Sequence, residues 1–195
     1  RVTDARGVTI LDARVHGFKV GLHATKTDGL VLDTLDVSDN YRQRLRSTPQ
    51  AEDGGDWLSG HHNDNNEWLR YGAGVYVEDS ENAEIRNVRA RRGQNGILLD
   101  RVNDSKIYDN DCSFLSCWGL GMWRSSRNMV SRNAFDFCVR GHVEGVYNRG
   151  QDSAGIFFFE QNNRNFIVEN SATHGGDCFF GFAGLEAIGE GAKEP

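Results

Sequence analysis

The residues between Arg140 and Gly155 combine acidic, basic and cationic groups within a short, glycine-containing segment. His142, Glu144, Arg149 and Asp152 all fall in this stretch. Such groups are suited to proton transfer beside an anionic substrate, because an acid or base moves the proton while a cation stabilises negative charge. The alternative is an ordinary salt-bridged surface loop.

One chemistry these residues support is hydrolysis of a glycosidic bond. That reaction requires two carboxyl groups about 5 Å apart for retention of configuration, or about 6.5–9.5 Å apart for inversion. Asp177 can pair with Asp152 or with Glu144, and Asp64 is a third candidate. We expect one carboxyl to protonate the leaving oxygen while the other attacks or activates water.

A second chemistry is the lyase or epimerase reaction on uronic acids, which removes the proton next to a carboxylate. The candidate bases are His142, His174 and Arg149. The reaction also needs cations that neutralise the substrate carboxylate. The candidates for that role are Arg91, Arg92, Arg140 and a bound Ca²⁺.

Aromatic residues gather in an earlier segment and suggest sugar binding. Trp57, Trp68 and Tyr71 lie close together, and Trp118 follows later in the chain. Aromatic faces stack on the apolar faces of sugar rings, so these four residues are candidate platforms for a polysaccharide. The alternative is that the tryptophans fix a long loop to the body of the protein.

The same segment contains candidate metal ligands. His61, His62 and Asp64 supply imidazole and carboxylate groups, although adjacent histidines rarely bind one ion together. Asp53, Asp56 and Glu67 nearby add oxygen ligands of the kind that Ca²⁺ prefers. The pattern does not match an EF-hand, and ordinary loop polarity is the alternative.

Composition excludes several classes of protein. The 195 residues carry a formal net charge of −6 and no basic run, which argues against nucleic acid as a partner. No apolar stretch approaches the roughly 20 residues that span a bilayer, so we expect no membrane partner. The four cysteines form no CxxC pair, and we expect buried free thiols, with a Cys112–Cys117 disulfide as an alternative.

A repeat of about 23 residues organises the elements that must position these groups. Short apolar runs follow Arg6, Asp28, Asn82, Asp104, Asn128 and Asn165, at spacings of 22, 54, 22, 24 and 37 residues. Asn87, Asn110, Asn133 and Asn170 follow the runs, and a glycine leads a second run in each repeat, as in Gly74-Val-Tyr-Val and Gly96-Ile-Leu-Leu. Such a unit cannot bury its apolar face alone, so the units must stack, with parallel strands and asparagine ladders along the axis. The repeat predicts an all-β parallel β-helix of about six coils.

Two insertions interrupt the period at the same point of the repeat. They cover about residues 41–71 and 141–153, after the asparagine corner and before the glycine-led strand. In a stacked coil this point is one edge of the prism. We therefore expect a groove with the insertions as walls and with Arg91, Arg92, Gln94, Cys117 and Trp118 on its floor. Decorative loops at a tolerant corner are the alternative.

Four charged residues end their glycine-led strands. Glu78, Asp100 and Glu160 are carboxylates, and Arg124 takes the corresponding place on the coil between the last two. Stacked carboxylates repel one another, so an arginine in the column is stabilising. We interpret this column as a solvent-exposed corner.

With its Asn- and Asp-led strands and its "GI.L" and "N.I..N" phrases, the chain resembles the right-handed parallel β-helix repeat family over about residues 5–187. This is the pectate-lyase-like superfamily, which includes NosD-like and carbohydrate-active proteins. The resemblance implies polysaccharide lyases, glycoside hydrolases, epimerases and non-catalytic modules, but no catalytic motif of any one member matches. It also implies copper delivery as a variant, which the two methionines, Met122 and Met129, argue against.

These patterns together predict a single carbohydrate-active domain in the secreted or periplasmic space. The leading hypothesis is a polysaccharide-degrading hydrolase that uses paired carboxylates in the groove. The alternatives are a lyase or epimerase on uronic acids and a non-catalytic carbohydrate-binding or structural module. Since the chain begins at Arg1 and shows no N-terminal capping helix, we expect it to be part of a longer β-helix.

Overall fold

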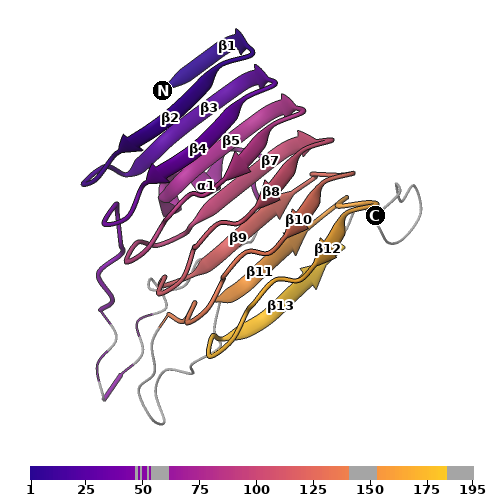
Figure 1. Cartoon of the computed structure of the whole chain (residues 1–195). Coiled ribbons are helices and arrows are strands. Elements are labelled where there is room, and N and C mark those ends of the chain that lie inside the picture. Colours follow the sequence, from indigo (N-terminus) through magenta and orange to yellow (C-terminus); the bar gives the residue numbers. More distant parts are fainter. Residues whose placement is uncertain (47, 49, 52, 54–61, 141–152, 184–195) are drawn as a thin grey trace.

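The computed structural model describes residues 1–183 except for 47, 49, 52, 54–61 and 141–152. Within these residues the chain winds into a right-handed parallel β-helix of six complete coils, and the strands stack in sequence order from the first coil to the last (Figure 1). The predicted fold class is confirmed.

Two parallel sheets form the body of the helix. The first sheet has the order β1-β3-β5-β7-β9-β11-β13, and the second has the order β2-β4-β6-β8-β10-β12. The strands of the first sheet are β1 (Val2–Arg6), β3 (Val20–Asp28), β5 (Ala73–Glu81), β7 (Ile97–Asn103), β9 (Trp118–Trp123), β11 (Ala154–Phe159) and β13 (Asp177–Phe182). Those of the second are β2 (Thr9–Arg14), β4 (Val31–Asp36), β6 (Glu84–Arg86), β8 (Lys106–Tyr108), β10 (Met129–Ser131) and β12 (Phe166–Val168). Each coil begins with a strand of the first sheet.

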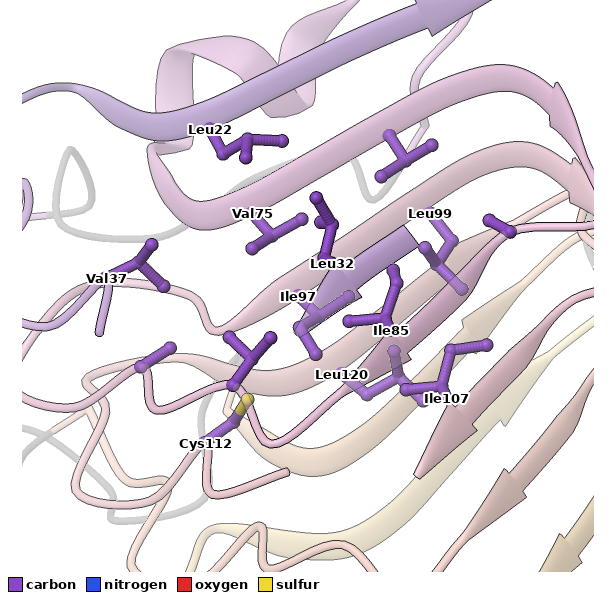
Figure 2. Close-up of a cluster of buried hydrophobic side chains, with 14 of the residues drawn as sticks. Leu22, Leu32, Val37, Val75, Ile85, Ile97, Leu99, Ile107, Cys112 and Leu120 are labelled. Carbon is purple, nitrogen blue, oxygen red and sulfur yellow. The ribbon is translucent and has the colours of Figure 1, made fainter. Parts of the chain in front are cut away.

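The core consists of apolar columns that run along the axis. Inward-facing residues of the first sheet stack in register from Leu22 through Val75, Ile97 and Leu120 to Ile156. A second column faces it from the second sheet, where Leu32, Ile85, Ile107 and Val130 pair in the same way. Figure 2 shows members of both columns meeting in the interior. Neighbouring coils are about 4.8 Å apart, so each side chain packs directly on its counterpart.

The glycines that lead the first-sheet strands have a steric cause. A Cβ atom added to Gly96 would lie 2.4 Å from the carbonyl oxygen of Gly119, and one added to Gly119 would lie 2.6 Å from that of Gly155. These distances are shorter than any real contact of a Cβ atom. Only glycine fits this column because the backbone of the next coil occupies the position of a side chain.

Asparagine ladders satisfy buried backbone groups at the turns. Asn110 Nδ2 donates to Asn133 Oδ1, and Asn133 Nδ2 donates to Asn170 Oδ1, each at 2.9 Å. The same amides donate to the backbone carbonyls of Ile85 and Ile107. The predicted ladder therefore exists.

Asn87 does not belong to that ladder, and the prediction was wrong there. The backbone amide of Val88, not of Asn87, donates to Asn110 Oδ1, so Asn87 lies one position outside the register. It occupies a left-handed corner with φ 52° and donates to Asp33 at the surface.

Left-handed residues form four columns along the helix, with six members each among the described residues. They mark the corners of every coil, and they include many side chains other than the expected glycine, asparagine and aspartate. The first column is Asp4, Lys26, Asp79, Arg101, Arg124 and Glu160; the second is Gly7, Gly29, Asn82, Asp104, Arg127 and Arg164; the third is Asp12, Thr34, Asn87, Asp109, Arg132 and Glu169; the fourth is Gly17, Asp39, Arg92, Phe114, Phe137 and His174. Acid–arginine pairs link neighbouring coils within these columns, as between Asp109 and Arg132 at 2.8 Å.

Candidate functional site

The outer face of the first sheet changes character along the helix. Thr25, Glu78, Asp100, Trp123 and Phe159 stand in register on successive strands. The face is therefore polar over β3, β5 and β7 and aromatic over β9 and β11. Glu78 is 6% exposed and Asp100 is fully buried, so the prediction of a solvent-exposed corner was wrong for both.

The register of the expected charge column also differs. Arg124 and Glu160 stand in the left-handed column with Arg101, one residue beyond the positions of Glu78 and Asp100. Arg124 and Glu160 follow the last residues of β9 and β11 and adopt left-handed backbone, so the four charges divide into two neighbouring groups.

The last part of the first insertion covers this face. It ends in the short helix α1 (Glu67–Tyr71), whose Trp68 is completely buried. The Trp68 ring lies 5.1 Å from the Trp118 ring and 5.9 Å from the Phe157 ring. Trp118 is 1% exposed, and Tyr71 contacts it edge-on. Trp68 and Trp118 thus fix the insertion to the sheet, and their faces are not available to a sugar.

Asn63 connects the insertion to the polar half of the face. It is buried, and its Nδ2 donates to Asp100 Oδ2 at 2.7 Å and to the Tyr76 hydroxyl at 3.0 Å. Its Oδ1 accepts from the backbone amide of Trp68. Because Asn63 is held on three sides, the residues before and after it, His62 and Asp64, have defined positions at the edge of the sheet.

Two buried carboxyl groups lie under this tether. The Thr25 hydroxyl donates to Glu78 Oε1 at 2.6 Å, and His23 Nε2 lies 2.9 Å from the same oxygen. Asp100 accepts hydrogen bonds from Arg101, Asn63 and Tyr76. Burial raises the pKa of Asp100 to about 7, although the charge of Arg101 opposes that shift.

The second group of charges forms a half-open constellation beside the first. Arg124 Nη2 lies 2.9 Å from Glu160 Oε2 and 3.1 Å from Asp64 Oδ1. The two carboxyl oxygens share one nitrogen, so they are at most 6.0 Å apart. His62 Nδ1 lies 3.5 Å from Glu160 Oε1. Glu160 is 3% exposed, whereas the side chains of Asp64 and His62 are 51% and 46% exposed, so solvent reaches this constellation from one side.

Aromatic residues line the buried side of the constellation. The Phe159 and Trp123 rings lie 5.0 and 6.0 Å from the His62 ring. The indole N–H of Trp123 is buried and has no hydrogen-bond partner among the residues that the structure describes. A hollow of about 280 Å³ also opens beside Glu160, bordered by Asn162 and Phe182. The arrangement combines an acid, a base and a cation beside buried aromatic rings.

The remaining sequence-predicted residues divide between a second location and the undescribed segments. Arg92 makes a bidentate ion pair with Asp39, and Arg91 pairs with Asp111 above the Phe114 ring. Arg140 is 1% exposed and contacts Gln43, so the bases of the two insertions meet. Trp57, His61, His142, Glu144, Arg149 and Asp152 lie outside the described residues.

His174 and Asp177 lie at the last described corner and strand. His174 stacks on Phe137 at 4.8 Å, and Phe137 stacks in turn on Phe114. These rings cover one another's faces, so they form a structural ladder. Asp177 begins β13 and is exposed. The carboxyl pairs that the sequence suggested for Asp177 involve partners outside the described residues.

Among the described residues, no three His, Cys, Asp or Glu side chains converge in a way that would hold a metal ion. The four cysteines are free; Cys112, Cys117 and Cys138 are buried and Cys178 is exposed. Burial raises the pKa of Cys138 to about 12, which leaves its thiol unreactive.

No helix in the described part of the chain is long and apolar enough to cross a membrane.

Comparison with protein families places the chain. The model of the NosD family, described as periplasmic copper-binding protein (NosD), matches residues 2–174. The chain belongs to the NosD family. Searches of curated proteins and of solved structures gave no match.

The described residues do not fit the copper named in the family description. A copper site requires thiolate, thioether or imidazole ligands that converge. The buried cysteine thiols lie in the core, Met122 is buried on an inward-facing strand position, and no imidazole pair approaches either group among the described residues.

Sequence reasoning missed the role of several site residues. Glu78, Asp100, Arg124 and Glu160 were recognised as a column but were taken to be exposed, and His23 and Asn63 were not singled out. The signal for burial was the pair of tryptophans that begin and end β9, Trp118 and Trp123, which pack with Trp68 of the insertion. Large apolar rings on the outer face of a sheet must be shielded from water, and the insertion packs over them.

Proposed function

We propose that this NosD-family protein is a carbohydrate-active β-helix that hydrolyses a polysaccharide at the constellation of His62, Asp64, Arg124 and Glu160. The observation that carries the proposal is the pair of carboxyl groups around Arg124. Their oxygens lie at most 6.0 Å apart, an upper bound that admits the separation of about 5–5.5 Å found in retaining glycosidases.

The environments of the two carboxyl groups suggest their roles. Glu160 is buried and accepts hydrogen bonds from Arg124, so we assign it as the candidate nucleophile. Asp64 is half-exposed on the insertion and is the candidate proton donor to the leaving oxygen. His62, whose side chain is 46% exposed, is positioned to bind a hydroxyl group of the sugar.

The same geometry favours a hydrolase over the lyase alternative. A lyase needs a cation that is available to neutralise the carboxylate of a uronic acid. Arg124 already binds two carboxylates of the protein, so a substrate carboxylate would compete with both. A non-catalytic module remains the second candidate, because the buried faces of Trp68 and Trp118 leave no aromatic platform there.

The test is product release from a panel of neutral, sulfated and uronic-acid polysaccharides, with and without EDTA. Reducing ends and the absorbance of unsaturated uronates are read together. We expect reducing ends alone, and we expect Glu160→Gln and Asp64→Asn each to lower the rate by about a hundredfold or more.

The matched control is Asp109→Asn, which removes the carboxylate partner of Arg132 at another corner and should leave the rate unchanged. Circular dichroism confirms that each variant is folded. Unsaturated uronates would favour the lyase, and loss of activity on EDTA treatment would point to a required metal. Binding without any product would favour the non-catalytic module.

We propose a periplasmic or secreted location, in line with the periplasmic description of the family. Fractionation of cells that express the chain with its native flanking sequence tests this, and recovery in the cytoplasm would contradict it.

A further inference from the structure

The beginning of the first insertion forms a basic strip at the opposite end of the first sheet. Its base is fixed, because Gln94 donates from its backbone amide to the Tyr41 carbonyl and accepts from the amide of Gln43. From there, exposure alternates along the chain. Arg42, Arg44 and Arg46 are exposed, whereas the residues between them are half-buried.

This alternation places the three arginines on one side of an extended segment. Successive arginines are separated by two residues, or about 6.6 Å of extended chain. The segment from Tyr41 to Thr48 curves around a hollow of about 990 Å³. No ion pair joins Arg42 or Arg44 to a carboxylate of the described residues, and the nearby Asp39 is already used by Arg92.

A fourth guanidinium lies directly behind the strip. Arg140 is 1% exposed, and its Nη2 reaches Gln43 Oε1 at 3.4 Å. Its Nε and Nη1 are buried and have no hydrogen-bond partner among the described residues. A buried cation without an anion is costly, and a guanidinium with free donors is suited to bind an anionic oxygen. The Arg140 guanidinium therefore favours an anion close to Gln43, and Gln43 lines the hollow.

We propose that the hollow formed by Arg42, Gln43 and Arg44, with Arg140 behind it, binds the anionic oxygens of an acidic polysaccharide. The ligand chemistry is a carboxylate or sulfate carried repeatedly on a polymer, because the strip repeats its cations along an extended direction. Arginine matches both groups through paired N–H donors.

Nucleic acid fits this surface less well. Binding of single strands relies on aromatic faces on which bases stack. The one aromatic ring of the strip, Tyr41, has the Lys19 ammonium 3.4 Å from its centre. The formal net charge of −6 also works against a polyphosphate partner.

The inference names the substrate class for the proposed function and in that respect rests on it. The strip and the Glu160 constellation lie at opposite ends of the first-sheet strands, about 20 Å apart for six residues of extended chain. A polymer of several sugars can contact both. Binding is measured here without turnover, so failure of hydrolysis and failure of the anion site are distinguishable.

The experiment measures binding of the whole chain to immobilised polygalacturonate, dextran sulfate, neutral dextran and single-stranded DNA at low salt. We expect the Arg42→Gln/Arg44→Gln double variant to lose about tenfold in affinity for one or both acidic polysaccharides. The control is Arg6→Gln/Arg14→Gln, which removes the same charge from exposed positions of the first coil and should change affinity less than about twofold.

Comparison of the four polymers identifies the anionic group that the site binds. Stronger binding of polygalacturonate assigns a carboxylate polymer, and stronger binding of dextran sulfate assigns a sulfated one. The proposal is overturned if the Arg42/Arg44 variant binds like the native chain, if neutral dextran binds equally well, or if DNA is the preferred ligand.

Arg140→Met provides a second, independent readout. Methionine removes the unpaired buried charge while filling similar space, so the variant should unfold at a higher temperature and bind the acidic polymer more weakly. A purely structural role of Arg140 predicts the opposite change in stability, with unaltered binding.

Discussion

Two ion pairs of the same construction have different surroundings in this molecule. Arg132 with Asp109 and Arg124 with Glu160 each link neighbouring coils through left-handed corner residues. The first pair is 49% and 41% exposed, whereas the second is 24% and 3% exposed. The difference arises because His62, Asn63 and Asp64 close over the second pair. An insertion has therefore converted one step of a repetitive surface ladder into a recess with a carboxyl pair.

The largest expected effect comes from removing the tether that creates this difference. Asn63→Ala deletes hydrogen bonds to Tyr76, Asp100 and the Trp68 amide, and it leaves buried polar groups without partners. We expect the free energy of unfolding to fall by about 3 kcal/mol. Urea denaturation measures this.

The control for that prediction is Asn65→Ala, whose side chain is exposed and bonds only to Glu67. Its effect should stay below about 0.5 kcal/mol. Equal effects of the two substitutions would show that Asn63 does not hold the insertion.

The second comparison breaks each ion pair in turn. Glu160→Gln leaves the partly buried Arg124 short of an anion, and we expect a loss of about 2 kcal/mol in the free energy of unfolding. Asp109→Asn should lower the free energy of unfolding much less, because its pair is exposed to solvent. If both substitutions cost the same in urea denaturation, then cover by the insertion has no energetic consequence.

The third prediction concerns the pH dependence of the buried carboxyl groups under the tether. The pKa of Asp100 is raised to about 7, from an ordinary value of 3.8, so the folded state holds a proton that the unfolded state releases. Stability from this proton is present at acidic pH and is lost as the pH rises toward and through 7. Between pH 6 and 8 the native chain should lose about 1 kcal/mol more than Asp100→Asn. Parallel pH dependences of the two proteins would contradict the raised pKa.

The smallest expected effect is the response to salt. Salt should weaken the coupling in an exposed ion pair more than the coupling in the covered pair. Arg127 with Asp104 and Arg132 with Asp109 are open to counterions, and the Arg127 and Arg132 guanidiniums hold the pKa of Asp104 and Asp109 below the usual range. In a double-mutant cycle for Arg132 and Asp109, 1 M NaCl should weaken the coupling between the two charges. The coupling between Arg124 and Glu160 should change less, and the reverse order would argue against a covered site.

The fold was predictable because its causes are local and repeated. The glycine column and the asparagine ladder follow from contacts that recur in every coil, so Gly96 and Asn133 carry the pattern in their own neighbourhoods. Asn87 shows where this pattern fails. Coil length varies by one residue, so an asparagine at the repeat spacing can lie at the left-handed corner instead of in the ladder. The corners themselves were less predictable, since Arg124, Phe137 and Glu160 take left-handed backbone where asparagine or glycine was expected.

The site was only partly predictable because it depends on where an insertion folds. The sequence identified His62 and Asp64 as chemically capable, and it identified Glu160 and Arg124 as a column. Their meeting requires Asn63 and Trp68 to dock on the outer face of a sheet, and no spacing in the repeat specifies that docking. The same docking removed Trp68 and Trp118 from the set of sugar platforms.

The acid–arginine pairs also carry information about assembly order. Every junction from the first coil to the sixth contains at least one such pair, and the column that holds it changes from junction to junction. The pairs are Arg6–Asp28, Asp39–Arg92, Asp79–Arg101, Asp104–Arg127, Asp109–Arg132 and Arg124–Glu160. Nearly identical coils are otherwise interchangeable as stacking partners during folding. If the fourth coil skipped the fifth, Asp109 would face Glu169 instead of Arg132, so the third column disfavours that stacking error.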